Sequence, residues 1–182
     1  MLNEKKSDFI IILVGRLLQV VIMLVSIKVM TGLLEPEDMG NIYIFTTVYT
    51  FFVMLFISPL GQYINRHTHK WHEEKSLLNN IAIYLFYLFS ISTFSIIIGY
   101  FIYSFGISNN IPIGIFLILL ASFILFLTLN QTILPVLNML DYRANFIILM
   151  VLTALGIVVF GYIFVNLFGN TAENWLFGTV MS

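Results

Sequence analysis

The sequence predicts an all-α polytopic membrane protein, with five transmembrane helices and the start of a sixth. Of its 182 residues, 60% are hydrophobic and only 9% are charged, whereas an ordinary soluble domain has about 25% charged residues. No charged residue occurs in 39–65, 76–140 or 144–172. A helix needs about 20 apolar residues to cross a bilayer core of about 30 Å, so each of these stretches is long enough to span a membrane.

Polar turns divide the apolar sequence into successive spans. We place them at 9–34, 41–65, 78–104, 113–134 and 146–168, with a partial span at 175–182, all within one domain, 1–182. The glycines, asparagines and proline of FGISNNIPIG form a turn between the third and fourth spans. The first span is too long for a cleaved signal peptide, and it contains Arg16 and Lys28.

Basic residues outside the spans gather on one side of the predicted membrane. Six of the eight lie in the N-terminal tail, the loop after the second span and the loop after the fourth span: Lys5, Lys6, Arg66, Lys70, Lys75 and Arg143. The opposite loops, 35–40, 106–112 and 169–174, contain none. Cytoplasmic loops are enriched in lysine and arginine, whereas acids have little effect on orientation. The N-terminus is therefore predicted to be cytoplasmic, and EPEDMG to be a short outside loop.

The two cations of the first span are the most unusual residues of the sequence. A charged residue at mid-span is unfavourable by about 2.5–3.5 kcal/mol, so it needs a partner, a hydrated cavity or a route to the interface. At 100° per residue, Arg16, Gln19, Met23 and Ser26 share one stripe. Lys28 falls about 120° from Arg16, so either the helix bends or the two cations act on different surfaces.

The second span is polar for a membrane helix. Its polar and small residues are Tyr43, Thr46, Thr47, Thr50, Ser58, Gly61, Gln62 and Asn65. They indicate either hydrogen bonding between packed helices or the wall of a hydrated cavity. Pro59 is expected to kink the helix, and Arg66 to anchor its cytoplasmic end.

No catalytic or metal motif stands out. RHTHKWHEEK, 66–75, holds all three histidines, and we expect a solvated loop there rather than a metal site. Asn130 begins a glycosylation sequon, but it lies at the end of a span. Phosphate-binding glycine loops and G-x-x-x-G pairs are absent from the sequence. We therefore predict no enzyme activity, no cofactor, no metal and no nucleic-acid partner.

The stretch GRLLQVVIMLVSIKVMTGLLEPEDMGNIYIF resembles the opening of the polysaccharide-export flippases, the O-antigen (Wzx-type) transporters of the MATE-like superfamily. The resemblance rests on Arg16 and Gln19, on Lys28, and on the L-x-P-E-x-x-G turn from Leu34 to Gly40. It continues to Arg66 at the end of the second span and covers about the first 70 residues; beyond them only hydropathy agrees.

The resemblance implies a transporter of twelve or more spans, in two lobes around a cavity that opens alternately to each side. The cargo would be an undecaprenyl-diphosphate-linked oligosaccharide in a bacterial inner membrane. By position, Arg16 and Gln19 would lie in the substrate cavity, followed by Lys28 and Arg66. The chain is shorter than one lobe, so we expect the N-terminal part of a longer protein. Its partners would be membrane lipids and either the missing half or polysaccharide-assembly proteins.

Two other classes remain open. The chain could be a small accessory or scaffold protein of an envelope-assembly complex, with Trp175 as an interface anchor. It could also be a membrane enzyme that acts on lipid-linked sugars, for which the acids of EPED are the only candidates. Their place in a tight outside turn makes them poor catalysts. The flippase interpretation accounts best for the turn motif and for Arg16.

Overall fold

A computed structural model of the chain describes residues 2–106 and 111–182, and the side chains of 10–106 and 111–182. Every regular element in those ranges is a helix. The expected turn between the third and fourth spans lies partly in 107–110, outside the described residues. The helices are α1 (Leu2–Leu33), α2 (Pro36–Phe52), η1 (Val53–Ile57), α3 (Ser58–Glu73), α4 (Leu77–Ser104), α5 (Ile113–Ser122), η2 (Phe123–Leu127), α6 (Thr128–Met139), α7 (Arg143–Phe168) and α8 (Ala172–Val180).

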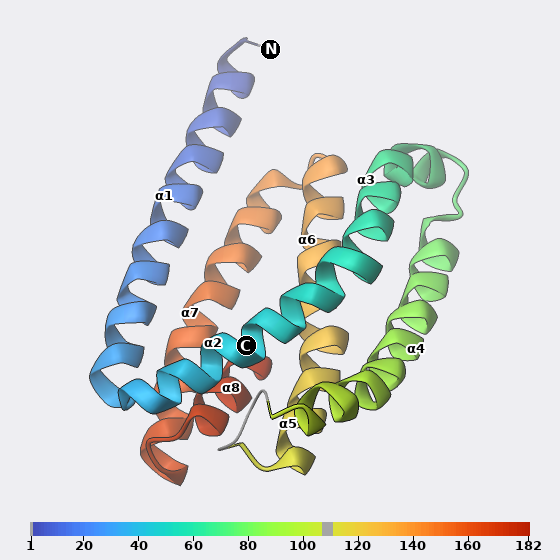
Figure 1. Cartoon of the computed structure of the whole chain (residues 1–182). Coiled ribbons are helices and arrows are strands. Elements are labelled where there is room, and N and C mark those ends of the chain that lie inside the picture. Colours follow the sequence, from blue (N-terminus) through green and yellow to red (C-terminus); the bar gives the residue numbers. More distant parts are fainter. Residues whose placement is uncertain (1, 107–110) are drawn as a thin grey trace.

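Five of the helical segments are long and apolar enough to cross a membrane, so the all-α polytopic fold is confirmed (Figure 1). Two of the five are composite. Helices α2, η1 and α3 form one segment of 38 residues, and α5, η2 and α6 form one of 27. In each, a π-helical turn interrupts the α-helix. The partial sixth span is a short helix, α8, which packs against α7.

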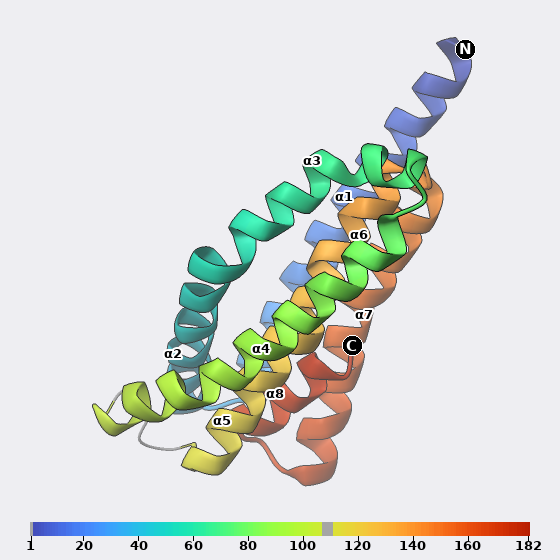
Figure 2. The ribbon, with the colours of Figure 1, turned by 90° about the vertical axis from the view of Figure 1, so that its right-hand side faces the viewer.

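The bundle has two ends of different composition (Figures 1 and 2). The N-terminus, the α3–α4 turn and the α6–α7 turn lie together, and we call this the basic end. The α1–α2 and α7–α8 turns lie at the other end, which we call the acidic end because Glu35, Glu37 and Asp38 are there. The first turns of α1 project beyond the other helices at the basic end in both views.

The prediction that EPEDMG is a loop was wrong, because α2 already begins at Pro36. Proline is favourable at the first position of a helix, where its missing N–H has no helical partner. Glu37 and Asp38 occupy the first turn of α2, where acids are stabilised by the helix dipole. The side chain of Asp38 also accepts a 3.0 Å hydrogen bond from the backbone N–H of Ala172 and so caps α8. The acids of this segment therefore support two helix N-termini.

The solvated loop expected at 66–75 was also wrong, since α3 continues to Glu73. Tyr63, His67 and Trp71 repeat every four residues and form an aromatic ladder, with ring centroids 4.1 Å apart for the first pair and 5.6 Å for the second. Residues four apart are neighbours on a helix surface, and their contacts stabilise it. The polar composition of this stretch thus belongs to a helix that extends beyond its apolar part.

Pro59 accompanies a bend in its membrane segment (Figure 2), whereas Pro135 lies inside an α-helix. The kink expected at Pro59 is confirmed: the π-helical turn η1 lies directly before it, and the chain bends between α2 and α3 (Figure 2). The Ser58 N–H bonds the carbonyl of Val53, five residues back. Pro135, by contrast, lies inside α6, which runs past the predicted end of the fourth span to Met139. The turn to α7 is only three residues long.

Helix α4 stabilises both π-helical turns. Tyr87 donates a 2.8 Å hydrogen bond to the carbonyl of Phe56 in η1, and Ser92 donates one of 2.8 Å to the carbonyl of Ala121, just before η2. A π-helical turn disturbs the regular pairing of backbone carbonyls, and an unpaired carbonyl is unfavourable inside a membrane. These two hydroxyls therefore help α4 to hold the irregular turns in place.

Helices α7 and α8 approach each other closely at two glycines. Added to Gly178, a Cβ would lie 2.6 Å from backbone atoms of Gly161. The ring of Trp175 covers Gly161 itself, with ring carbons 3.1 Å from a Cβ placed there. Small residues let membrane helices pack backbone against backbone. The sequence gives no sign of this contact, because the two glycines belong to different helices.

Candidate functional site

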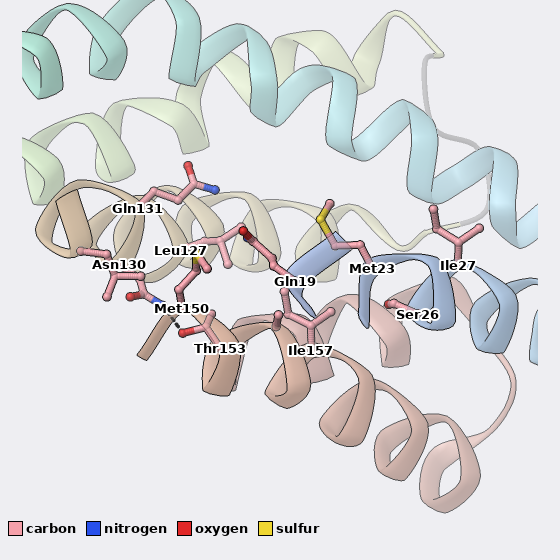
Figure 3. A pocket seen from close by; sticks show the side chains of 12 residues that line it. Gln19, Met23, Ser26, Ile27, Leu127, Asn130, Gln131, Met150, Thr153 and Ile157 are labelled. Carbon is pink, nitrogen blue, oxygen red and sulfur yellow. Dashed lines mark hydrogen bonds between the residues drawn. The ribbon is translucent and has the colours of Figure 1, made fainter. Parts of the chain in front are cut away.

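A groove lies among helices α1, α6 and α7 (Figure 3). Its volume is about 360 Å³ and it is open on one side. Twelve residues from α1, the end of η2, α6 and α7 line it: Gln19, Met23, Ser26, Ile27, Leu127, Asn130, Gln131, Leu134, Met150, Thr153, Ala154 and Ile157. Five of these carry amide or hydroxyl groups: Gln19, Ser26, Asn130, Gln131 and Thr153.

One wall of the groove is the α1 stripe that the sequence predicts. Gln19, Met23 and Ser26 face α6 and α7, as their spacing requires (Figure 3). Arg16, one turn before Gln19, donates a 3.3 Å hydrogen bond to the side-chain oxygen of Gln19. Its guanidinium lies over the ring of Phe146 in α7, 5.6 Å from the centroid, which is within the range of a cation–π interaction. Arg16 therefore lies just beyond the groove and contacts its first polar residue.

The opposite wall carries two consecutive amides. Asn130 donates a 3.1 Å hydrogen bond to Thr153, which joins α6 to α7. Gln131 is exposed and is also a lining residue of the groove. Thr153 is ten residues from the start of α7, which is about 15 Å of helix at 1.5 Å per residue. A bilayer core is about 30 Å thick, so these amides lie near its middle.

The groove borders the irregular part of the neighbouring helix. Leu127, the last residue of η2, lines it. The next residue, Thr128, contacts the Tyr49 hydroxyl at 3.4 Å, and Thr132 contacts the Tyr84 hydroxyl at 2.7 Å. Helix α6 is thus fixed to α2 and α4 by buried hydroxyls, while Asn130 and Gln131 line the groove. The Gln131 amide also interacts with the Tyr49 hydroxyl of α2.

Helix α3 adds a further polar stripe on the far side of α6. Gly61 faces Thr132 of α6, and Phe56, at the start of the bend, packs against Phe94 of α4. One flank of α3 carries four polar residues at helical spacing: Ser58, Gln62, Asn65 and His69. The side-chain oxygen of Asn65 is buried without a hydrogen-bond partner among the described residues.

The structure separates the four residues predicted for the substrate cavity. Gly15 packs on Ile147, close to the start of α7, and this places Arg16 within about 6 Å of the basic end at 1.5 Å per residue. Gly61 of α3 faces Thr132 of α6, and the two helices run in the same direction toward the basic end (Figure 1). Arg66 follows Gly61 by five residues, so it lies about as close to the basic end as Arg16 does. Both side chains are exposed, so neither is a deeply buried cation.

Lys28 lies apart from the groove. Gln19 and Lys28 are nine residues apart, so they point to opposite sides of α1 at 100° per residue. The Lys28 side chain is exposed near the acidic end. Of the two possibilities left open by the sequence, the second holds: Arg16 and Lys28 belong to different surfaces. Gln19 is thus the one residue of the predicted four that lines the groove.

The polar residues of α2 that suggested helix packing are turned outward. Tyr43, Thr47 and Thr50 are exposed. The hydroxyls of Thr46 and Thr47 donate to carbonyls of their own helix, at 2.8 and 2.7 Å. Such bonds within one helix do not connect it to another. These residues therefore leave α2 with a polar outer face rather than a packed one.

Sequence reasoning missed Asn130, Gln131 and Thr153. Asn130 was set aside as a sequon at the end of a span, although an amide pair in the middle of an apolar segment is itself a signal of a polar site. The three histidines, which do follow a suggestive pattern, are spread around α3. Among the described residues, no three histidine or acidic side chains come together as metal ligands.

No protein-family model, curated protein or solved structure matches the chain.

Proposed function

We propose that the chain takes part in moving an undecaprenyl-diphosphate-linked oligosaccharide across the bacterial inner membrane by alternating access. In this proposal the basic end is cytoplasmic, in keeping with the distribution of lysine and arginine. The observation that carries the proposal is the open groove at mid-membrane depth, where five amide and hydroxyl side chains lie among twelve lining residues. The chain provides a path and no covalent chemistry.

Polar side chains at this depth are unfavourable unless they are paired or serve a function. A sugar chain has many hydroxyls, and each must keep a hydrogen-bond partner while it crosses the apolar core. Gln19, Asn130, Gln131 and Thr153 supply such partners. A lipid carrier could remain in the bilayer while its sugars enter through the open side of the groove.

The cations at the basic end suit the diphosphate of such a cargo. Arginine binds phosphate oxygens through several N–H groups held in one plane. Arg16 and Arg66 are both exposed, on helices that separate toward this end (Figure 1). They would attract the diphosphate from the cytoplasmic leaflet before the sugars enter the groove.

The two π-helical turns support a moving transporter. They interrupt the second and fourth membrane segments, and η2 borders the groove through Leu127. π-Helical turns occur frequently at functional sites, and broken membrane helices accompany substrate sites in many transporters. We propose that these turns are the points at which the segments bend.

The proposal is tested by substituting Arg16 in the gene as it exists in the source organism. With Arg16→Ala or Arg16→Leu, surface polysaccharide is expected to fall and lipid-linked precursor to accumulate, at unchanged protein level. The control is Lys70→Ala, which removes an exposed cation of α3 whose ion-pair partner is Glu74, 3.8 Å away. If both Arg16 variants produce normal polysaccharide, Arg16 serves only as an interfacial anchor and the proposal loses its cation site.

An accessory or scaffold role is the second candidate, and the exposed surface of α1 favours it. This helix packs mainly against α7, and large apolar side chains such as Leu17 and Leu24 are 60% and 63% exposed. Leu17→Ser with Leu24→Ser would abolish polysaccharide assembly if α1 docks a protein partner. In that case the Arg16 variants would be silent.

A further inference from the structure

We propose that the groove receives an uncharged sugar residue and selects against acidic sugars. This inference rests on the proposed function, and it adds which part of the cargo the groove holds. The amides Gln19, Asn130 and Gln131 bind the sugar at mid-depth, whereas the diphosphate stays near Arg16 at the cytoplasmic end. The site thus has two parts of different chemistry, separated along α1.

The first support is the absence of ionisable groups from the groove. None of the described residues that line it is an acid, a lysine, an arginine or a histidine. An ionised carboxylate loses its hydration at this depth and needs a cation to compensate. The groove offers none, since Arg16 lies toward the basic end and Lys28 points away from it. A uronic or sialic acid would therefore be disfavoured, and a neutral hexose or N-acetylhexosamine would not.

The second support is the hydrogen-bonding capacity that the lining keeps. Asn130 uses its amide nitrogen on Thr153, which leaves its side-chain oxygen as an acceptor. The side-chain oxygen of Gln19 accepts a hydrogen bond from Arg16, so its side-chain nitrogen remains available as a donor. Pro135 has no N–H, so it cannot give the carbonyl of Gln131 its usual helical bond. Donors and acceptors lie side by side, which suits sugar hydroxyls because each hydroxyl both donates and accepts.

The third support is size. The groove volume of 360 Å³ corresponds to about twelve water molecules at ~30 Å³ each. A hexose has about as many non-hydrogen atoms, so one sugar residue fits with part of its hydration. The cargo would then pass through the groove one residue at a time.

The test measures binding of three probes to the purified protein in lipid nanodiscs. The probes are a polyprenyl diphosphate alone, the same lipid linked to N-acetylglucosamine, and the same lipid linked to glucuronic acid. We expect the N-acetylglucosamine probe to bind more tightly than the bare lipid, and the glucuronic acid probe to bind less tightly than the neutral one. Arg16→Ala should weaken the binding of all three probes.

Variants of Gln131 test whether the sugar residue binds in the groove. Gln131→Leu should weaken binding of the N-acetylglucosamine probe about fivefold, which is the effect of one net hydrogen bond. Binding of the bare lipid should stay unchanged. The matched control, Asn166→Leu, also replaces an exposed amide by leucine, but on α7 beyond the groove, and it should change nothing. Gln131→Lys adds a cation and should restore binding of the glucuronic acid probe.

Two outcomes overturn the inference in distinguishable ways. If the bare lipid binds but neither sugar alters the affinity, or if both sugars bind equally well, the groove does not select a neutral sugar and the proposed function stands. If none of the probes binds, the proposed function fails and the inference fails with it.

Discussion

Replacing Gly178 by alanine tests whether α8 is held against α7 by close backbone packing. The new Cβ would lie 2.6 Å from the Cα and N atoms of Gly161 and from the carbonyl carbon of Phe160. Carbon atoms prefer separations of about 3.5–4.0 Å. Since all three neighbours are backbone atoms, no side chain can rotate aside, and the two helices must separate by about 1 Å.

The magnitude follows from two opposing effects. Overpacking at a close contact destabilises a protein by about 1–3 kcal/mol. Alanine has a better helix propensity than glycine, by about 1 kcal/mol. We expect Gly178→Ala to lower the free energy of unfolding by up to about 2 kcal/mol, the difference between these terms. Separation of the helices would also loosen Trp175, whose ring packs on Gly161.

The assay is thermal unfolding of the purified protein in detergent, with Gly40→Ala as the control. Gly40 is helical, and a Cβ added to it meets nothing within 4 Å. The control should therefore be stabilised slightly, by about 0.5–1 kcal/mol, so the two substitutions shift the melting temperature in opposite directions. Equal shifts of the same sign would refute the close α7–α8 crossing.

Three more predictions concern the acidic end, the groove and the bend. Asp38→Ala should destabilise the protein by about 1 kcal/mol because α8 loses its cap, and Asp38→Asn by less; equal melting temperatures for wild type and Asp38→Ala would exclude the cap. The chain has no cysteine, so an introduced cysteine can be labelled specifically. Gln131→Cys should react with a membrane-impermeant thiol reagent, whereas Leu152→Cys, on an exposed apolar position of α7, should not. Labelling of both or of neither would contradict a hydrated groove. Tyr87→Phe removes the hydrogen bond to the Phe56 carbonyl and should lower the free energy of unfolding by about 0.5–1.5 kcal/mol. It should also raise the rate of amide hydrogen exchange in η1. An unchanged exchange rate would show that this bond does not hold the π-helical turn.

The five membrane segments could be predicted because hydropathy over about 20 residues depends on composition alone. Their ends could not, because polar stretches continued as helix. Pro36 begins α2 and Pro135 lies within α6. Hydropathy detects where a chain leaves the apolar core and does not detect where its backbone hydrogen bonds stop.

The candidate site was predicted in part. The stripe that contains Gln19 and Ser26 follows from 100° per residue, and it lines the groove. Its partners on α6 and α7 depend on how distant helices pack, which a single sequence does not contain. The partner of Asp38, the N–H of Ala172, is 134 residues away and was hidden for the same reason.

The most direct measurement of the central claim is transport in inverted inner-membrane vesicles from the source organism. Vesicles from wild-type cells and from cells lacking the gene are given a fluorescent polyprenyl-diphosphate-linked saccharide on the outer, formerly cytoplasmic, face. We predict that the probe becomes protected from a membrane-impermeant quencher in wild-type vesicles, and not in gene-deleted or Arg16→Ala vesicles. Equal protection with and without the gene would contradict the proposal that this chain moves a lipid-linked sugar.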